Sequence, residues 1–236
     1  HREMVPRPFL SACNEHCLEV GKDLSRGGAK YNVGPVITGI GLAVAANSLA
    51  AVKKLVFEDR ACGMATLVDA LRANWQGYEP LRRLAADAPK YGNDDDYVDA
   101  IARKVANHFY HEVHRYRDIF GNPFTSAFMG ISNYIPMGRV LGATPDGRKN
   151  GEPSSEGISP YVGTDRSTPL AAMRSAAKLN QEMHAGGTLL NLRLNPELVA
   201  TKRGQANLGA MIQTLFALGG FHVQFNCISS DVLREA

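Results

Sequence analysis

The amino-acid sequence predicts an α/β fold built on parallel strands. In its second half, helices and strands alternate: we expect helices over residues 168–179 and 205–218, and strands over residues 188–194 and 221–228. The last of these strands alternates polar and apolar side chains with a period of two. A helix begins again after it. This order is typical of a parallel sheet or barrel, because parallel strands need a crossover connection, usually a helix.

The first predicted elements are a helix and a glycine-rich segment. The spacing of apolar side chains indicates a helix over residues 9–24, which Gly27 and Gly28 end. Several glycines then interrupt the apolar residues 33–46. Glycine destabilises a helix interior, so this segment is expected to be a strand or a closely packed loop.

Three further helices are expected before the alternating half. Asn47 or Ser48 is expected to cap a helix that runs to about Phe57, with Leu49 among its inward residues. A second helix covers residues 65–75. The third covers residues 94–116, with apolar residues at helical spacing and an acidic triplet at its N-terminus, where the helix dipole favours negative charge.

A strand and a turn connect these helices to the alternating half. Residues 131–141 are predicted to form a strand that ends near Met137, and a glycine-rich loop over residues 142–148 follows. Its Thr-Pro-Asp-Gly sequence is typical of a type I turn. The strand end, Tyr134, Ile135, Pro136 and Met137, is mostly apolar.

Composition excludes some classes of function. The formal net charge is only +3, and lysine and arginine are scattered along 236 residues, so we expect no nucleic-acid binding. No apolar run has the length of a membrane helix, about 20 residues, so no membrane partner is expected. The first residues do not resemble a signal peptide, which favours a cytoplasmic location. The four cysteines are few and unevenly spaced, which favours reduced thiols.

Two groups of residues carry chemical alternatives. One helix carries His108, His111, Glu112 and His114, but their order matches no established zinc motif. A solvated polar face is therefore the preferred interpretation, and a metal-binding helix is the alternative. Cys17 and Glu19 could form a radical and acid-base pair on a loop. Within a helix, residues two apart point to different sides, so a structural role is preferred. No metal site is predicted.

A set of phrases resembles the glycyl radical enzyme family, in that family's order. The resemblance covers nearly the whole chain and is closer to the glycerol dehydratase, choline lyase and hydroxyproline dehydratase-type members than to pyruvate formate-lyase itself. The phrases are residues 27–32, 47–59, 89–95, 142–148 (Gly-Ala-Thr-Pro-Asp-Gly-Arg), 157–160, 187–191 and 221–226. The resemblance implies the second half-barrel of a ten-stranded α/β barrel, with several long surface helices.

The resemblance also implies the chemistry of a longer parent protein. Family members carry a thiyl-forming cysteine in a Gly-Cys-x-Glu phrase and a radical-bearing glycine in an Arg-Val-x-Gly-Tyr phrase. Neither phrase occurs in this sequence. Residues 1–236 are therefore expected to be a partial barrel domain without the N-terminal half, the cysteine loop and the glycyl radical domain, and both ends read as cut from a longer chain.

Function is inferred for that parent protein. It is expected to be a radical lyase, dehydratase or acyltransferase that cleaves a C–C, C–O or C–N bond of a small organic substrate. Its glycyl radical would be installed by an activating enzyme that uses S-adenosylmethionine and an iron–sulfur cluster, with no cofactor bound to this chain. The expected partners are the substrate, the activating enzyme, the rest of the barrel and a second copy in a homodimer.

No catalytic residue is expected in this chain, and a substrate pocket is the only candidate site. In family members the strand before the Gly-Ala-Thr-Pro-Asp-Gly-Arg turn lines the pocket, so Tyr134, Ile135, Pro136 and Met137 are the candidates. Their apolar character favours a substrate with a hydrophobic part, and ordinary barrel core is the alternative. A non-catalytic split subunit or scaffold paralogue is the alternative function.

Overall fold

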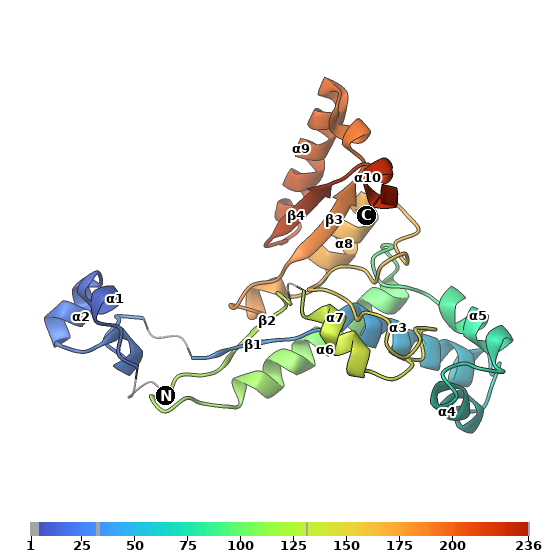
Figure 1. Ribbon diagram of the computed structural model, residues 1–236, viewed down its shortest axis with the longest axis horizontal. Coiled ribbons are helices and arrows are strands. Elements are labelled where there is room, and N and C mark those ends of the chain that lie inside the picture. Colours follow the sequence, from blue (N-terminus) through green and yellow to red (C-terminus); the bar gives the residue numbers. More distant parts are fainter. Residues whose placement is uncertain (1–4, 32–33, 131, 236) are drawn as a thin grey trace.

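The computed structural model describes residues 5–31, 34–130 and 132–235 of the chain. Helices predominate in these ranges, and short strands lie at the centre of the molecule (Figure 1). The α-helices are α1 (Pro8–Ala12), α2 (Glu15–Val20), α3 (Leu42–Val52), α4 (Met64–Arg72), α5 (Glu79–Asp87), α6 (Asp96–His114), α7 (Tyr134–Val140), α8 (Pro169–Ala177), α9 (Lys202–Ala217) and α10 (Ser230–Glu235). A π-helical segment, η2 (Lys53–Glu58), continues α3, and the 3₁₀ turns are η1 (Leu24–Arg26), η3 (Gln181–Met183) and η4 (Pro196–Val199).

The described strands form two parallel pairs, which confirms the parallel α/β architecture predicted from the sequence. An isolated parallel bridge between Phe128 and Thr188 joins one pair to the other. Helices connect the strands within each pair, as parallel pairing requires. The pairs are β1 (Val36–Thr38) with β2 (Thr125–Ala127), and β3 (Leu190–Leu194) with β4 (Val223–Cys227).

The strongly patterned elements lie where the sequence predicts them. α6 occupies almost the whole range expected for the long helix, and the side chain of Asp95 caps it by accepting from the backbone N–H of Tyr97 at 2.9 Å. Thr168 caps α8 in the same way. α9, β3 and β4 also agree with the expected ranges.

The helix expected over residues 9–24 is wrong, because two short helices replace it. α1 ends at Ala12, and Asn14 caps α2 by accepting from the backbone N–H of Cys17 at 3.3 Å. Asparagine side chains compete for backbone groups in this manner and favour helix starts over helix interiors. Gly21 then ends α2 in a left-handed conformation, with φ of 64°.

The helix start expected at Asn47 or Ser48 is also wrong. α3 begins at Leu42, because the alanine-rich residues that follow the glycines are strong helix formers. Asn47 lies fully buried inside α3, and its Oδ1 accepts from the backbone N–H of Tyr91 at 2.8 Å. Leu49, expected to face inward, is 50% exposed.

The predicted strand over residues 131–141 is a helix in the described residues. Ile131 lies outside them, and α7 occupies Tyr134–Val140. The strand of this region forms earlier in the chain, as β2. The apolar residues of α7 lack the alternation that distinguishes a strand, and such short apolar runs do not separate the two structures. Gly138 packs against the backbone of Pro153. A Cβ added at residue 138 would lie only 2.6 Å from the Cα of Pro153.

The main core lies between α3, α6 and the strands. Small side chains let the two helices approach closely: Ala46 and Ala50 on α3 and Ala102 and Ala106 on α6 are fully buried. Tyr91 fills the same core and donates its hydroxyl to the carbonyl of Ile158 at 2.9 Å. This bond ties the segment after α7 to the helical layer.

A second core lies around Trp75, between η2, α4 and α5. The Trp75 indole donates to the carbonyl of Arg148 at 3.2 Å, and this links the core to the Gly-Ala-Thr-Pro-Asp-Gly-Arg loop. The loop forms the expected turn, because the N–H of Gly147 donates to the carbonyl of Thr144 at 3.1 Å. The Arg148 guanidinium is buried and donates to four backbone carbonyls, of Leu141, Gly142, Lys149 and Glu152.

The N-terminal helices α1 and α2 stand apart from the rest of the molecule (Figure 1). They expose large apolar side chains: Phe9 is 90% exposed and Leu18 is 65% exposed. Val36 on β1 is half exposed as well. Among the helices that the structure describes, none combines the length and apolar character needed to cross a membrane.

Candidate active-site cavity

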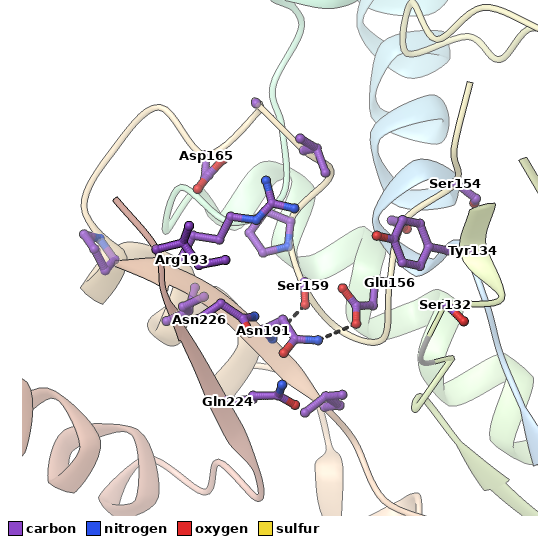
Figure 2. A pocket seen from close by; sticks show the side chains of 18 residues that line it. Ser132, Tyr134, Ser154, Glu156, Ser159, Asp165, Asn191, Arg193, Gln224 and Asn226 are labelled. Carbon is purple, nitrogen blue, oxygen red and sulfur yellow. Dashed lines mark hydrogen bonds between the residues drawn. The ribbon is translucent and has the colours of Figure 1, made fainter. Parts of the chain in front are cut away.

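A cavity of about 590 Å³ opens beside the β3–β4 pair. The two strands form one wall, the segment over residues 154–165 forms a second, and the start of α7 contributes from a third side (Figure 2). Its polar lining includes Tyr134, Glu156, Asn191, Arg193, Gln224 and Asn226.

The alternation of the strands places these polar side chains in the cavity. Leu190, Leu192 and Leu194 of β3 are buried, and the more exposed residues between them, Asn191 and Arg193, line the cavity together with Leu192. The register of β4 continues the polar face. Gln224 pairs with Asn191, and Asn226 pairs with Arg193.

Glu156 and Asn191 form the central contact of the cavity. The Nδ2 of Asn191 donates to Oε1 of Glu156, and the backbone N–H of Asn191 donates to Oγ of Ser159 at 2.9 Å (Figure 2). Burial raises the pKa of Glu156, while the hydrogen bond from Asn191 and the positive charge of Arg193 oppose that rise. The carboxyl group is therefore able to hold or release a proton nearer to neutral pH than a free glutamate.

Backbone contacts fix the segment that carries Glu156. The carbonyl of Ser155 accepts from the N–H of Gly41 at 3.1 Å. The side-chain Oγ of Ser155 accepts from the N–H of Val44, at the start of α3, at 3.2 Å. Gly157 has φ of 48°, and a Cβ there would collide with the carbonyl oxygen of Leu189. Glycine is required at this position because the segment approaches β3 too closely for any side chain.

Of the four candidate pocket residues, the structure brings one to the cavity. Tyr134 lines it, and the backbone carbonyl of Tyr134 accepts from the N–H of Ser154 at 2.9 Å. Ile135, Pro136 and Met137 follow on α7 and are not among the lining residues. Their part in a substrate pocket stays a prediction.

Sequence reasoning does not identify the polar residues of β3 and β4 as lining residues. The phrases over residues 187–191 and 221–226 carry the resemblance, but the sequence alone does not connect them with a pocket. Polar residues alternating with buried leucines on β3 are the signal that could have found Asn191 and Arg193, because a parallel strand is normally covered by apolar contacts on both faces.

The residues of both alternative chemical groups lie on helices, α2 and α6. Cys17 is 3% exposed within α2, while Glu19 contacts His16 at 3.0 Å on the surface. His114 stacks on Tyr110 of α6, with ring centroids 4.9 Å apart. Over residues 5–31, 34–130 and 132–235, no three His, Cys, Asp or Glu side chains are grouped so that they could hold a metal ion.

The family follows from comparison with known proteins. The family model described as pyruvate formate lyase-like matches residues 1–138, more than half of the chain. The chain belongs to this family. A second model, described as glycine radical, matches residues 154–236, which include every strand residue of the cavity wall.

Relatives of this glycyl radical family match the chain over nearly all its residues. The trans-4-hydroxy-L-proline dehydratase of Clostridioides difficile is 40% identical over 98% of the chain, and the (2S)-3-sulfopropanediol dehydratase of Klebsiella oxytoca is 37% identical over 100%. The glycerol-bound B12-independent glycerol dehydratase of Clostridium butyricum matches the whole chain with a TM-score of 0.96 and 39% identity.

These comparisons confirm the partial α/β barrel expected from the resemblance. The chain spans 29% of the length of either curated dehydratase and 30% of the glycerol dehydratase structure. The described elements, helices and parallel strand pairs that alternate along the chain, therefore correspond to one section of a glycyl radical enzyme.

Proposed function

We propose that this chain supplies part of the barrel of a glycyl radical enzyme that dehydrates or cleaves a small hydroxylated substrate. The observation that carries the proposal is the match of the whole chain to the glycerol-bound glycerol dehydratase at a TM-score of 0.96. The polar cavity supports it, since a carboxyl group, carboxamides and a guanidinium suit a ligand with several hydrogen-bonding groups.

The radical chemistry would be supplied by a glycyl radical in the complete protein, installed by an activating enzyme that uses S-adenosylmethionine and an iron–sulfur cluster. The residues of this chain would bind and orient the substrate and exclude water from it. Glu156 would hold or release a proton at the cavity wall, because burial brings its pKa closer to neutral.

The proposed partners follow from the same assignment. They are the small-molecule substrate, the activating enzyme, the remainder of the barrel and a second copy of the enzyme. The exposed apolar side chains of α1 and α2, such as Phe9 and Leu18, are proposed to contact the remainder of the barrel. A cytoplasmic location is proposed because glycyl radical activation uses reduced, oxygen-sensitive partners.

The test is anaerobic activation of the complete protein with its activating enzyme. Electron paramagnetic resonance should show a glycyl radical, and product analysis should show dehydration or cleavage of one compound in a panel of glycerol, trans-4-hydroxy-L-proline and (2S)-3-sulfopropanediol. A complete protein that carries no radical and converts no compound would contradict the proposal and support the scaffold alternative.

A further inference from the structure

Arg193 places a positive charge in the wall of the cavity. It alternates with the buried leucines of β3 and is exposed, so a molecule in the cavity can reach its guanidinium. Among the residues that the structure describes, it donates no hydrogen bond and forms no ion pair. A guanidinium only donates hydrogen bonds, so the ligand group that suits it is an acceptor, and a negatively charged one above all.

The register of the two strands arranges the polar cavity wall in two rows. Asn191 and Gln224 pair in the first row, where Nδ2 of Asn191 donates to Oε1 of Glu156. Arg193 and Asn226 pair in the second row, and both line the cavity (Figure 2). The rows are about 7 Å apart, because neighbouring residues on one face of a strand are separated by two steps of its rise. The carboxamide of Asn226 can add a donor beside the guanidinium.

The two acidic residues of the lining do not pair with Arg193. Glu156 belongs to the first row, and Arg193 acts on it through its positive charge without a direct contact. Asp165 is exposed on the loop above the strands, and it forms no ion pair with Arg193 (Figure 2). The guanidinium therefore lacks a compensating anion within the part of the chain that the structure describes.

Enclosure in the complete enzyme makes this charge consequential. The chain spans 30% of the length of the glycerol dehydratase structure, and under the proposed function the remainder of the barrel surrounds the cavity. A cation that loses its water without gaining an anion is costly. A carboxylate or sulfonate removes this cost, because two of its oxygens can accept from the two parallel N–H donors of a guanidinium.

We infer that Arg193 determines substrate specificity: its guanidinium, with the carboxamide of Asn226 beside it, binds a carboxylate or sulfonate group of the substrate. The first row, with Glu156 and Asn191, is then left for a hydroxyl group of the same molecule, within about 7 Å of the anionic group. This assignment rests on the proposed function and narrows its substrates from small hydroxylated molecules to hydroxylated anions. It places the selective contact on β3 rather than on α7.

The experiment uses calorimetry on the complete enzyme, before activation, with pairs of ligands that differ in one charged group. The pairs are (2S)-3-sulfopropanediol with glycerol, and trans-4-hydroxy-L-proline with its amide. For at least one pair, the wild type should bind the anionic member about tenfold more tightly or better, because hydrogen bonds to a charged group are the stronger ones. A ratio near one for both pairs would overturn the inference.

Arg193→Gln tests whether the preference for the anion comes from this side chain. It keeps a donor but loses the charge, so it should lower the binding ratio by about tenfold. A ratio that this variant leaves unchanged would contradict the inference and assign the anion that compensates Arg193 to the remainder of the barrel. Arg203→Gln removes an exposed charge on α9, outside the cavity lining, and is the matched control that should leave the ratio unchanged.

Arg193→Lys separates charge from geometry. It keeps the charge without the planar fork, so its ratio should lie between those of the wild type and Arg193→Gln, about threefold below the wild type. Equal ratios in the lysine and glutamine variants would argue against charge as the cause. Urea unfolding of each variant identifies any that fail to fold, and Arg193→Lys replaces Arg193→Gln if the glutamine variant does.

Binding and turnover distinguish this inference from the function on which it rests. In the activated enzyme, Arg193→Gln should raise the KM of an anionic substrate about tenfold with little change in kcat, because the contact is made before and during the reaction alike. A radical-bearing wild type that forms product, with a binding ratio that Arg193→Gln leaves intact, contradicts the inference alone. Absence of radical and product, with a ratio that Arg193→Gln lowers, contradicts the proposed function alone.

Discussion

The Nζ of Lys178 lies 2.8 Å from the fully buried Oδ2 of Asp99 and joins the end of α8 to α6. Lys178 also contacts Asp94 and Asp96, each at 2.7 Å, and Ser175 donates to the same carboxylate oxygen of Asp99 at 2.9 Å. The second oxygen, Oδ1 of Asp99, has no partner among the described residues. Lys178 provides the positive charge that compensates the buried carboxylate. This contact connects the helical layer to the half of the chain that forms the cavity.

Lys178→Met should destabilise the protein because it leaves the buried carboxylate of Asp99 without its cation. Breaking a buried pair in this way costs about 3 kcal/mol. The midpoint of urea unfolding measures the change. Lys104→Met, exposed on α6, is the control and should shift the midpoint little. The double variant with Asp99→Asn should recover part of the loss, and no recovery would argue against a charge effect.

His184 should make stability depend on pH. Burial lowers its pKa from 6.5 to about 4, and its side chain is buried beside Phe128 with Nδ1 2.8 Å from Oγ of Ser126. Between these two values the unfolded chain binds a proton that the folded chain does not. Stability contributed by neutral His184 is thus present above pH 6.5 and is lost as the pH falls towards 4.

The measurement is the free energy of unfolding at a series of pH values between 4 and 7. His184 should contribute a loss of about 3 kcal/mol across this range. His184→Gln, which does not titrate, should flatten the profile even if it lowers stability at pH 7. A variant profile as steep as that of the wild type would show that other groups dominate.

Gly157→Ala should be strongly destabilising, while Gly209→Ala should not. Alanine at residue 157 would have to adopt a φ of 48° and would collide with the carbonyl of Leu189. We therefore expect the free energy of unfolding to fall by about 2 kcal/mol or more. Gly209 lies within α9, and the methyl group of an alanine there would meet no described atom within 4 Å. This substitution should raise the free energy of unfolding by at most about 1 kcal/mol. Thermal unfolding of both variants compares the two, and equal shifts would refute the steric explanation.

Arg148→Lys should loosen the loop over residues 141–152. The planar guanidinium reaches the carbonyls of Leu141 and Glu152 at 3.1 and 2.6 Å, and an ammonium group cannot span both. We expect the free energy of unfolding to fall by about 2 kcal/mol and proteolysis within the loop to become faster. Arg139→Lys, exposed on α7, is the matched control. Protection of the loop in Arg148→Lys equal to that of the wild type would contradict this role.

The elements that the sequence predicts well have strong local signals. α6 combines a long apolar stripe with an acidic start, and α8 has Thr168 and Pro169 at its first positions. α3 and α7 differ from their predicted structures for local reasons as well. The helix-forming alanines after Leu42 outweigh the glycines before it, and the apolar residues of α7 carry no clear period.

The cavity depends on contacts that no local pattern contains. Glu156 meets Asn191 only because Gly157 lets its segment lie against Leu189, and because Tyr91 on the helical side binds the carbonyl of Ile158. Resemblance to the family predicts that a pocket exists near α7, but the register of β3 with β4 decides which side chains line it. Register is set by long-range pairing, which periodicity in one strand does not reveal.

The two strand pairs, which the bridge between Phe128 and Thr188 joins, close loops of very different length. β3 and β4 are separated by one α-helix, α9, whereas α3 to α6 intervene between β1 and β2. Closing a longer loop costs more entropy before any contact rewards it, and distant pairing slows folding. The β3–α9–β4 unit, which carries Asn191 and Gln224, is therefore expected to assemble first and to provide the edge on which the earlier strands later dock.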